Sequence, residues 1–133
     1  MSAASYLRIA AVVCAALLPV PEAAAVSCPV KTADQEIEGL DLIFIGGALK
    51  DEDVGGGKTR TVFRVDEVLL GAPMATVDIY QDAEDGIAFE SGSAPQLVGA
   101  KKQNDHYWTS LCINPLSGEA EVREALKKAQ SAP

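Results

Sequence analysis

The residues with the clearest chemical potential in this chain of 133 residues are its three cysteines. Cys14 lies in an apolar leader, whereas Cys28 and Cys112 lie in the remainder of the chain. In an oxidising compartment, two cysteines that survive removal of a leader usually pair. A disulfide between them would close the loop from residue 28 to residue 112. On the chain-entropy model, closing a loop of this length stabilises a domain by about 4.5 kcal/mol. We therefore expect Cys28 and Cys112 to form a structural disulfide rather than a reactive thiol site.

An export signal accounts for the leader. Arg8 is followed by an unbroken apolar run at 9–18, with the sequence IAAVVCAALL. A membrane-spanning helix needs roughly 20 apolar residues, whereas a run of about ten suits the core of a signal peptide. Residues 1–25 are therefore predicted to be a cleaved signal peptide. This makes the protein periplasmic or secreted and leaves no transmembrane segment in the mature chain.

The cleavage site decides which residue begins the mature chain. Ala23 and Ala25 satisfy the A-x-A rule for cleavage, which predicts a start at Val26. Ala25 and Ser27 also fit, and cleavage there would place Cys28 at the N-terminus. A third alternative is a lipoprotein in which Cys28 is acylated, although the large aliphatic residue usual three positions before such a cysteine is absent.

After the leader, residues 26–133 are expected to form a single domain, and their charge predicts little affinity for polyanions. A segment of this length builds one hydrophobic core. The chain carries 11 Lys and Arg against 19 Asp and Glu, a net charge of -8, and nucleic acids and anionic membranes are bound through excess positive charge. The acidic clusters at 51–53 and 82–85 lack the Asp-x-Asp-x-Asp-Gly spacing of a calcium loop. We expect no nucleic-acid partner and no cofactor.

Three sequence features resemble enzyme motifs but lack residues that those motifs require. Residues 55–59, GGGKT, resemble the end of a phosphate-binding loop, but Glu52 replaces its first glycine and a strand-like segment follows where a helix is required. His106 is the single histidine, which excludes a multi-histidine zinc site. Ser91 and Ser93 lack the G-x-S-x-G spacing of a nucleophile elbow. We therefore expect no enzymatic activity.

Alternating apolar residues predict a mainly β domain. Phe63 and Val65 would face one side of a strand while Arg64 and Asp66 face the other. The same alternation, or a short apolar run, predicts five strands, at 42–48, 60–68, 75–80, 97–100 and 107–112. The connections are predicted to be a polar hairpin loop at 51–57, an irregular stretch or short helix at 81–92, and a turn at 101–106.

A helix is predicted at the C-terminal end, after Ser117. Val122 and Leu126 recur there at helical spacing, with acidic residues first and Lys127 and Lys128 last, in accord with the helix dipole. Five strands and one helix are consistent with a small barrel.

Several short motifs follow one another in a characteristic order. They are Asp41–Gly46 (DLIFIG), Phe63-x-Val65-x-x-Val68-x-x-Gly71, Val77-x-Ile79, Phe89-x-x-Gly92, Leu97-Val98-x-Ala100 and Thr109-Ser110-x-Cys112. In this order they resemble the netrin-like module, and more narrowly the bacterial relatives of the tissue inhibitors of metalloproteinases. The resemblance extends from residue 28 to about residue 129. It implies a mainly β fold, a five-stranded OB-type Greek-key barrel with a C-terminal α-helix and one disulfide.

Two departures from the family pattern bear on function. Val26 stands where members commonly have a first cysteine, and Asp85-Gly86 stands where they have Cys-Gly. The resemblance thus implies that one of two family disulfides is absent and that Cys28 and Cys112 form the other. The family's inhibitors place the amino and carbonyl groups of an N-terminal cysteine on the zinc of a protease, and the missing bond is the one that would fix that cysteine.

The sequence therefore predicts an exported, non-enzymatic module of the cell envelope that binds a partner or is structural. The alternative is a metalloprotease inhibitor that acts through its N-terminal segment, which requires Cys28 to be the first residue. Tyr107 and Trp108 alternate on the last predicted strand, so one should enter the core and the other lie at the surface. The candidate contacts with a protein partner or envelope ligand are Val26, Ser27, Cys28 and Trp108.

Overall fold

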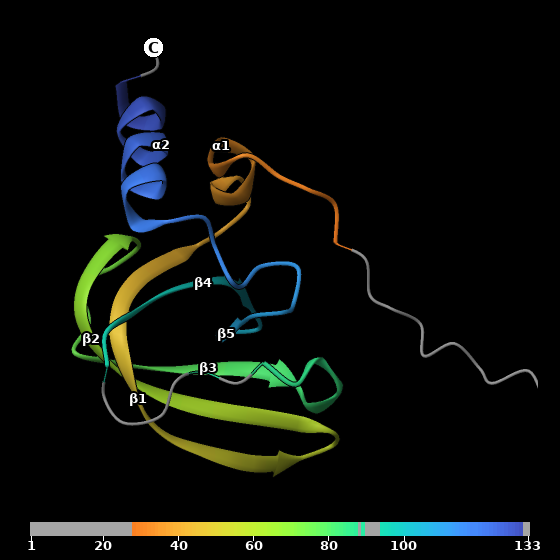
Figure 1. The fold of residues 1–133 in the computed structure, drawn as a ribbon. Helices are drawn as coiled ribbons and strands as arrows, with labels where there is room; N and C mark the ends of the chain where they lie inside the picture. The colour runs from red at the N-terminus through yellow and green to blue at the C-terminus, as the bar shows by residue number, and fades with distance from the viewer. Residues whose placement is uncertain (1–27, 88, 90–93, 132–133) are drawn as a thin grey trace, which may run out of the picture.

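Strand alternation produces a five-stranded barrel with helices packed at one end (Figure 1). The computed structural model describes residues 28–87, 89 and 94–131. The elements in chain order are α1 (Ala33–Ile37), β1 (Leu42–Gly55), β2 (Lys58–Leu70), β3 (Thr76–Asp82), the 3-10 helix η1 (Ala83–Asp85), β4 (Gln96–Gln103), β5 (His106–Trp108) and α2 (Glu119–Ser131). Among these described residues, no helix is both long and apolar enough to cross a membrane.

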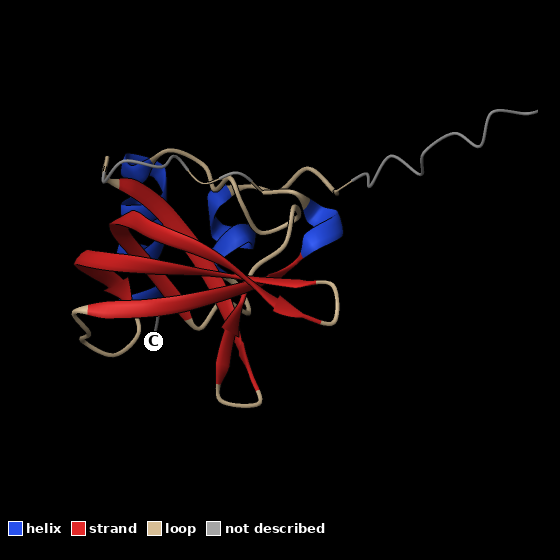
Figure 2. Ribbon diagram, turned by 90° about the horizontal axis from the view of Figure 1, so that it is seen from below, coloured by secondary structure: helices blue, strands red, loops and turns tan. Residues whose placement is uncertain are grey.

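The barrel closes in the order β1-β2-β3-β5-β4. Every neighbouring pair is antiparallel except β3 and β5, which run parallel and pair only at Ile79–Tyr107 and Tyr80–Trp108. Parallel neighbours need a crossover connection, and here β4 lies in that crossover. Figure 2 shows the strands twisting across one another. The predicted fold class, a five-stranded OB-type Greek-key barrel with a C-terminal helix and one disulfide, is confirmed.

The barrel is filled by apolar side chains from the inner faces of its strands. Phe44, Phe63, Ile79 and Val98 are fully buried there. The rings of Phe44 and Phe63 meet edge to face with centroids 5.2 Å apart. Burying a side chain of this size contributes about 1.5–3 kcal/mol relative to exposure, so the alternation seen in the sequence is the main source of the barrel's stability.

A second apolar layer lies between the barrel and the helices. Ile43 of β1 points away from the barrel interior and packs with Val122 and Leu126 of α2. Because Leu42 and Phe44 point inwards, β1 is buried on both faces, which explains its continuous apolar run. The two helices contact each other (Figure 1), and they cover this outer face of β1.

The hairpin between β1 and β2 is longer than predicted. The loop predicted at 51–57 is wrong, because β1 continues to Gly55 and only Gly56 and Gly57 form the turn. Both turn glycines have positive φ, 64° and 71°, as a two-residue hairpin turn requires. Thr61 donates to Asp51 across the strands over 2.5 Å. The polar residues therefore form a solvated two-stranded arm, because cross-strand pairs replace a hydrophobic face.

Other elements also differ from the prediction. The fifth strand ends at Trp108 rather than residue 112, because the chain turns away after Thr109 donates to the Tyr80 carbonyl over 2.9 Å. The turn predicted at 101–106 is confined to Asn104 and Asp105, both with positive φ. Helix α1 was not predicted, although Thr32 and Gln35 form a capping box at its start. The segment 81–92 contains the short helix η1, with 88 and 90–92 outside the described residues.

Candidate functional site

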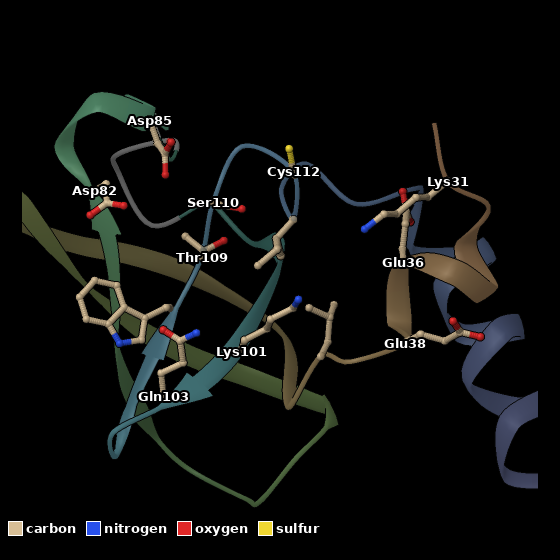
Figure 3. Close-up of a pocket in the computed structure, with 13 residues that line it drawn as sticks. Lys31, Glu36, Glu38, Asp82, Asp85, Lys101, Gln103, Thr109, Ser110 and Cys112 are labelled. Carbon is tan, nitrogen blue, oxygen red and sulfur yellow. The ribbon is translucent and has the colours of Figure 1, made fainter. Parts of the chain in front are cut away.

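A pocket of about 300 Å³ opens between α1 and the end of the barrel formed by β3, β4 and β5 (Figure 3). Lys31, Glu36 and Glu38 come from α1 and the residues on either side of it. Asp82 and Asp85 face them from the end of β3 and from η1. The remaining lining residues come from β4, β5 and the chain after β5, together with Leu40: Lys101, Gln103, Trp108, Thr109, Ser110, Cys112 and Ile113. The pocket therefore joins segments that are distant in the sequence.

The disulfide fixes one rim of this pocket. Cys28 and Cys112 are bonded across a sequence separation of 84, with Cα atoms 5.1 Å apart. The predicted pairing is confirmed. Figure 3 shows the Cys112 sulfur at the rim, above Thr109. The bond ties the segment before α1 to the loop after β5.

A buried amide holds the loop that carries Cys112. Asn114 donates from Nδ2 to the Gly99 carbonyl over 2.8 Å and accepts from the Gly99 N–H over 3.1 Å. The same Nδ2 also contacts Thr109 Oγ1. The Asn114 side chain thus pairs with β4 as a neighbouring strand would. It satisfies the Gly99 N–H and carbonyl, which would be costly to bury unpaired.

Trp108 is the surface aromatic and Tyr107 the core aromatic of the predicted pair. Tyr107 packs against the barrel core, whereas Trp108 is half-buried on the outer face and lines the pocket. The Nζ of Lys58 lies 4.8 Å from the Trp108 ring centroid and donates to Asp82 over 2.9 Å. The ring is therefore held in place by a cation that is itself paired.

The charges on the pocket wall are mixed and partly unpaired. Glu36 accepts from the Ser117 N–H over 2.9 Å, and Asp82 is paired with Lys58. Within the described part of the chain, Asp85 and Lys101 have no side-chain hydrogen-bond or ion-pair partner. The pocket therefore offers both an acceptor and a donor to a polar ligand.

Two exposed apolar side chains flank the disulfide. Val30, two residues after Cys28, is fully exposed, and Leu111, next to Cys112, is 39 % exposed. Because the cysteines are bonded, these two side chains lie on adjoining segments. Neither residue could be singled out from the sequence, because neither belongs to a periodic apolar pattern and an isolated apolar residue in a loop carries no signal of its own.

The groups with shifted pKa values lie away from the pocket, in surface ion pairs. Hydrogen bonds from Lys50 and then Arg60 lower the pKa of Glu52. A hydrogen bond from Arg123 lowers the pKa of Glu67, and these pairs raise the pKa values of both arginines. Among the described residues, no group of three or more His, Cys, Asp and Glu is placed to hold a metal ion.

The predicted contact residues fall partly at this site. Trp108 lines the pocket, and Cys28 is bonded to Cys112 on its rim. Val26 and Ser27 lie outside the described residues. Asp85, which stands where the netrin-like pattern has a cysteine, also lines the pocket.

No protein-family model matches the chain, and no curated protein matches it. The fold class rests on the barrel itself, and the netrin-like resemblance stays a prediction.

Proposed function

We propose that the protein is an exported, netrin-like module of the cell envelope that binds a protein partner and has no enzymatic activity. The observation that supports this is the pair of exposed apolar side chains, Val30 and Leu111, on the two segments joined by the Cys28–Cys112 disulfide. Exposed apolar groups lose contact with water when a partner covers them, which favours association.

The disulfide makes this surface suitable for binding because it restricts motion before the partner arrives. The segment that carries Val30 precedes α1 and is linked covalently to the loop that carries Leu111. Asn114 in turn fastens that loop to β4. A surface that is already ordered loses less conformational entropy on binding. The disulfide therefore keeps the segments that carry the two apolar side chains close together.

A photo-crosslinking experiment tests the proposal directly. A photoreactive amino acid is placed at Leu111 in the protein expressed in its host cell, and the adducts formed on irradiation are identified by mass spectrometry. The matched control places the same amino acid at Leu49, an exposed leucine on the β1–β2 arm. We expect a discrete protein adduct from position 111 and none from position 49. Identical adduct patterns from both positions, or no adduct from position 111, would contradict the proposal.

A second candidate function, inhibition of a metalloprotease, is favoured by the same Cys28–Cys112 disulfide. Val30 projects fully exposed from the segment that Cys28 anchors, so the segment could enter the cleft of a protease. The mechanism requires Cys28 to be the first residue, since its amino group must reach the zinc. N-terminal sequencing of the exported protein, followed by a zinc-protease assay, separates the two functions. A start at Val26 without inhibition excludes the inhibitor.

A further inference from the structure

The register of the barrel places a row of large side chains on its outer face. Across the strands, Glu52 pairs with Arg60, Arg60 with Tyr80, Tyr80 with Trp108, and Trp108 with Lys101. Residues paired in this way share a face of the sheet. Because the neighbours Thr61 and Ile79 are fully buried, the row faces outwards.

Three aromatic rings are contiguous on this face. The Tyr80 centroid lies 4.7 Å from that of His106 and 5.3 Å from that of Trp108, with the rings tilted by 48° and 37°. His106 is exposed, and the other two rings are half-buried. The three rings, which we call the aromatic strip, therefore form a short band rather than a single exposed side chain.

Two cationic side chains neighbour the aromatic strip. Arg60 lies opposite Tyr80 in the β2–β3 register and donates to Glu52, which raises the pKa of Arg60. Lys58 lies over Trp108 and is paired with Asp82. Lys58 thus limits the motion of the Trp108 ring in the free protein.

The strip leads into the pocket described above, because Trp108 belongs to both. Figure 3 shows Gln103 and Lys101 on one side of the opening and Asp82, Asp85 and Thr109 on another. Within the described part of the chain, the side chains of Asp85, Lys101 and Gln103 have no hydrogen-bond partner. A carboxylate, an ammonium and an amide therefore remain available at the end of the strip.

The chemistry of this combination selects among ligand classes. An apolar ligand would bury the charged groups of Asp85 and Lys101 without partners, which is costly. A polyanion is disfavoured by the net charge of -8. A pyranose ring fits both parts of the site, because its C–H face can pack on an aromatic ring with a negative face. Its hydroxyl groups, each both donor and acceptor, can pair with groups of either charge.

We propose that the aromatic strip and the adjoining pocket bind a neutral oligosaccharide of pyranose units. The sugar rings pack along Tyr80 and Trp108 and displace Lys58 Nζ from its place over the Trp108 ring. The hydroxyl groups of a terminal unit bond to Asp85, Lys101 and Gln103. This site goes beyond the proposed function, since it uses neither Val30 nor Leu111. A protein partner and a glycan could therefore be bound on neighbouring surfaces.

The single tryptophan of the chain makes the proposal directly measurable, because Trp108 reports on the site by its own fluorescence. The purified, disulfide-bonded protein is titrated with the neutral tetrasaccharides of N-acetylglucosamine, cellulose and starch. We expect a saturable change of Trp108 emission with at least one of them. Dextran sulfate serves as the anionic comparison.

Three variants locate the binding. Tyr80→Ala, which removes the central ring, should weaken the affinity about threefold to tenfold. Gln103→Ala alters only an exposed pocket side chain, and it should weaken the affinity about threefold. Leu49→Ala, at an exposed position of β1 that belongs neither to the aromatic strip nor to the pocket lining, should leave it unchanged.

Two results would overturn the glycan proposal. One is the absence of a saturable change with every neutral tetrasaccharide at millimolar concentration, including the case in which only dextran sulfate binds. The other is binding that Tyr80→Ala and Gln103→Ala both leave unchanged. The crosslink from position 111 is measured separately in Tyr80→Ala, so failure of the glycan site and failure of the protein contact can be told apart.

Discussion

Removal of the Cys28–Cys112 disulfide should cost this small domain much of its stability. The bond closes a loop with a sequence separation of 84, and the chain-entropy model assigns about 4.5 kcal/mol to a loop of this size. Native disulfides commonly contribute about 2–4 kcal/mol. For a domain of this length, roughly 1 kcal/mol shifts the melting temperature by about 4–8 °C. We therefore expect the Cys28→Ser, Cys112→Ser double variant to melt roughly 10–25 °C below the wild type.

Thermal unfolding followed by far-UV circular dichroism at pH 7 measures this difference. The double variant avoids the free thiol that a single substitution would leave. Dithiothreitol provides the matched control: it should lower the melting temperature of the wild type to that of the double variant and leave the variant unchanged. A double variant that is already unfolded at 25 °C would place the loss at the upper end of the range.

A melting temperature within about 2 °C of the wild type would refute this reasoning. It would mean either that the loop is already closed in the unfolded chain or that the two segments are held by other contacts. In that case the disulfide could not be the element that orders Val30 and Leu111.

Two further predictions concern the contact between α2 and β2 and the loop that carries Cys112. Glu67→Gln disrupts the pair of hydrogen bonds that Arg123 donates to the two Glu67 oxygens. Because the pKa of Glu67 is lowered in the folded state, this ion pair stabilises the protein at pH values above the ordinary glutamate pKa. The variant should therefore melt slightly lower at pH 7, and a difference from the wild type that does not shrink as the pH falls below the ordinary glutamate pKa of 4.5 would contradict this assignment. Asn114→Ala leaves the Gly99 N–H and carbonyl unpaired and should cost about 1–3 kcal/mol in urea unfolding, whereas the exposed-site control Gln130→Ala should cost nothing measurable.

The barrel could be predicted from the sequence because its strands follow local patterns. Phe63 and Val65 alternate with polar neighbours, and the run at 42–44 is apolar throughout because β1 is buried on both faces. The disulfide followed from compartment and cysteine count. The arm at 51–55 was assigned to a loop because its residues are charged, and charge in a strand is favourable only when a partner such as Arg60 lies opposite.

The candidate site could not be predicted in the same way, because it depends on contacts between distant segments. Tyr80 and Trp108 are neighbours only through the two-residue parallel pairing of β3 with β5. Asp85 and Lys101 meet at the pocket only after the barrel has closed. Helix α1, by contrast, could have been found, since Thr32 and Gln35 have the spacing of a capping box.

Intact-mass analysis combined with N-terminal sequencing of the exported protein tests the central claim most directly. A disulfide-bonded partner-binding module is expected to begin at Val26 and to weigh two hydrogens less than its reduced form. A chain that begins at Cys28 with a free amino group would favour the inhibitor instead. An acylated Cys28, or a chain that retains residues 1–25, would contradict the account.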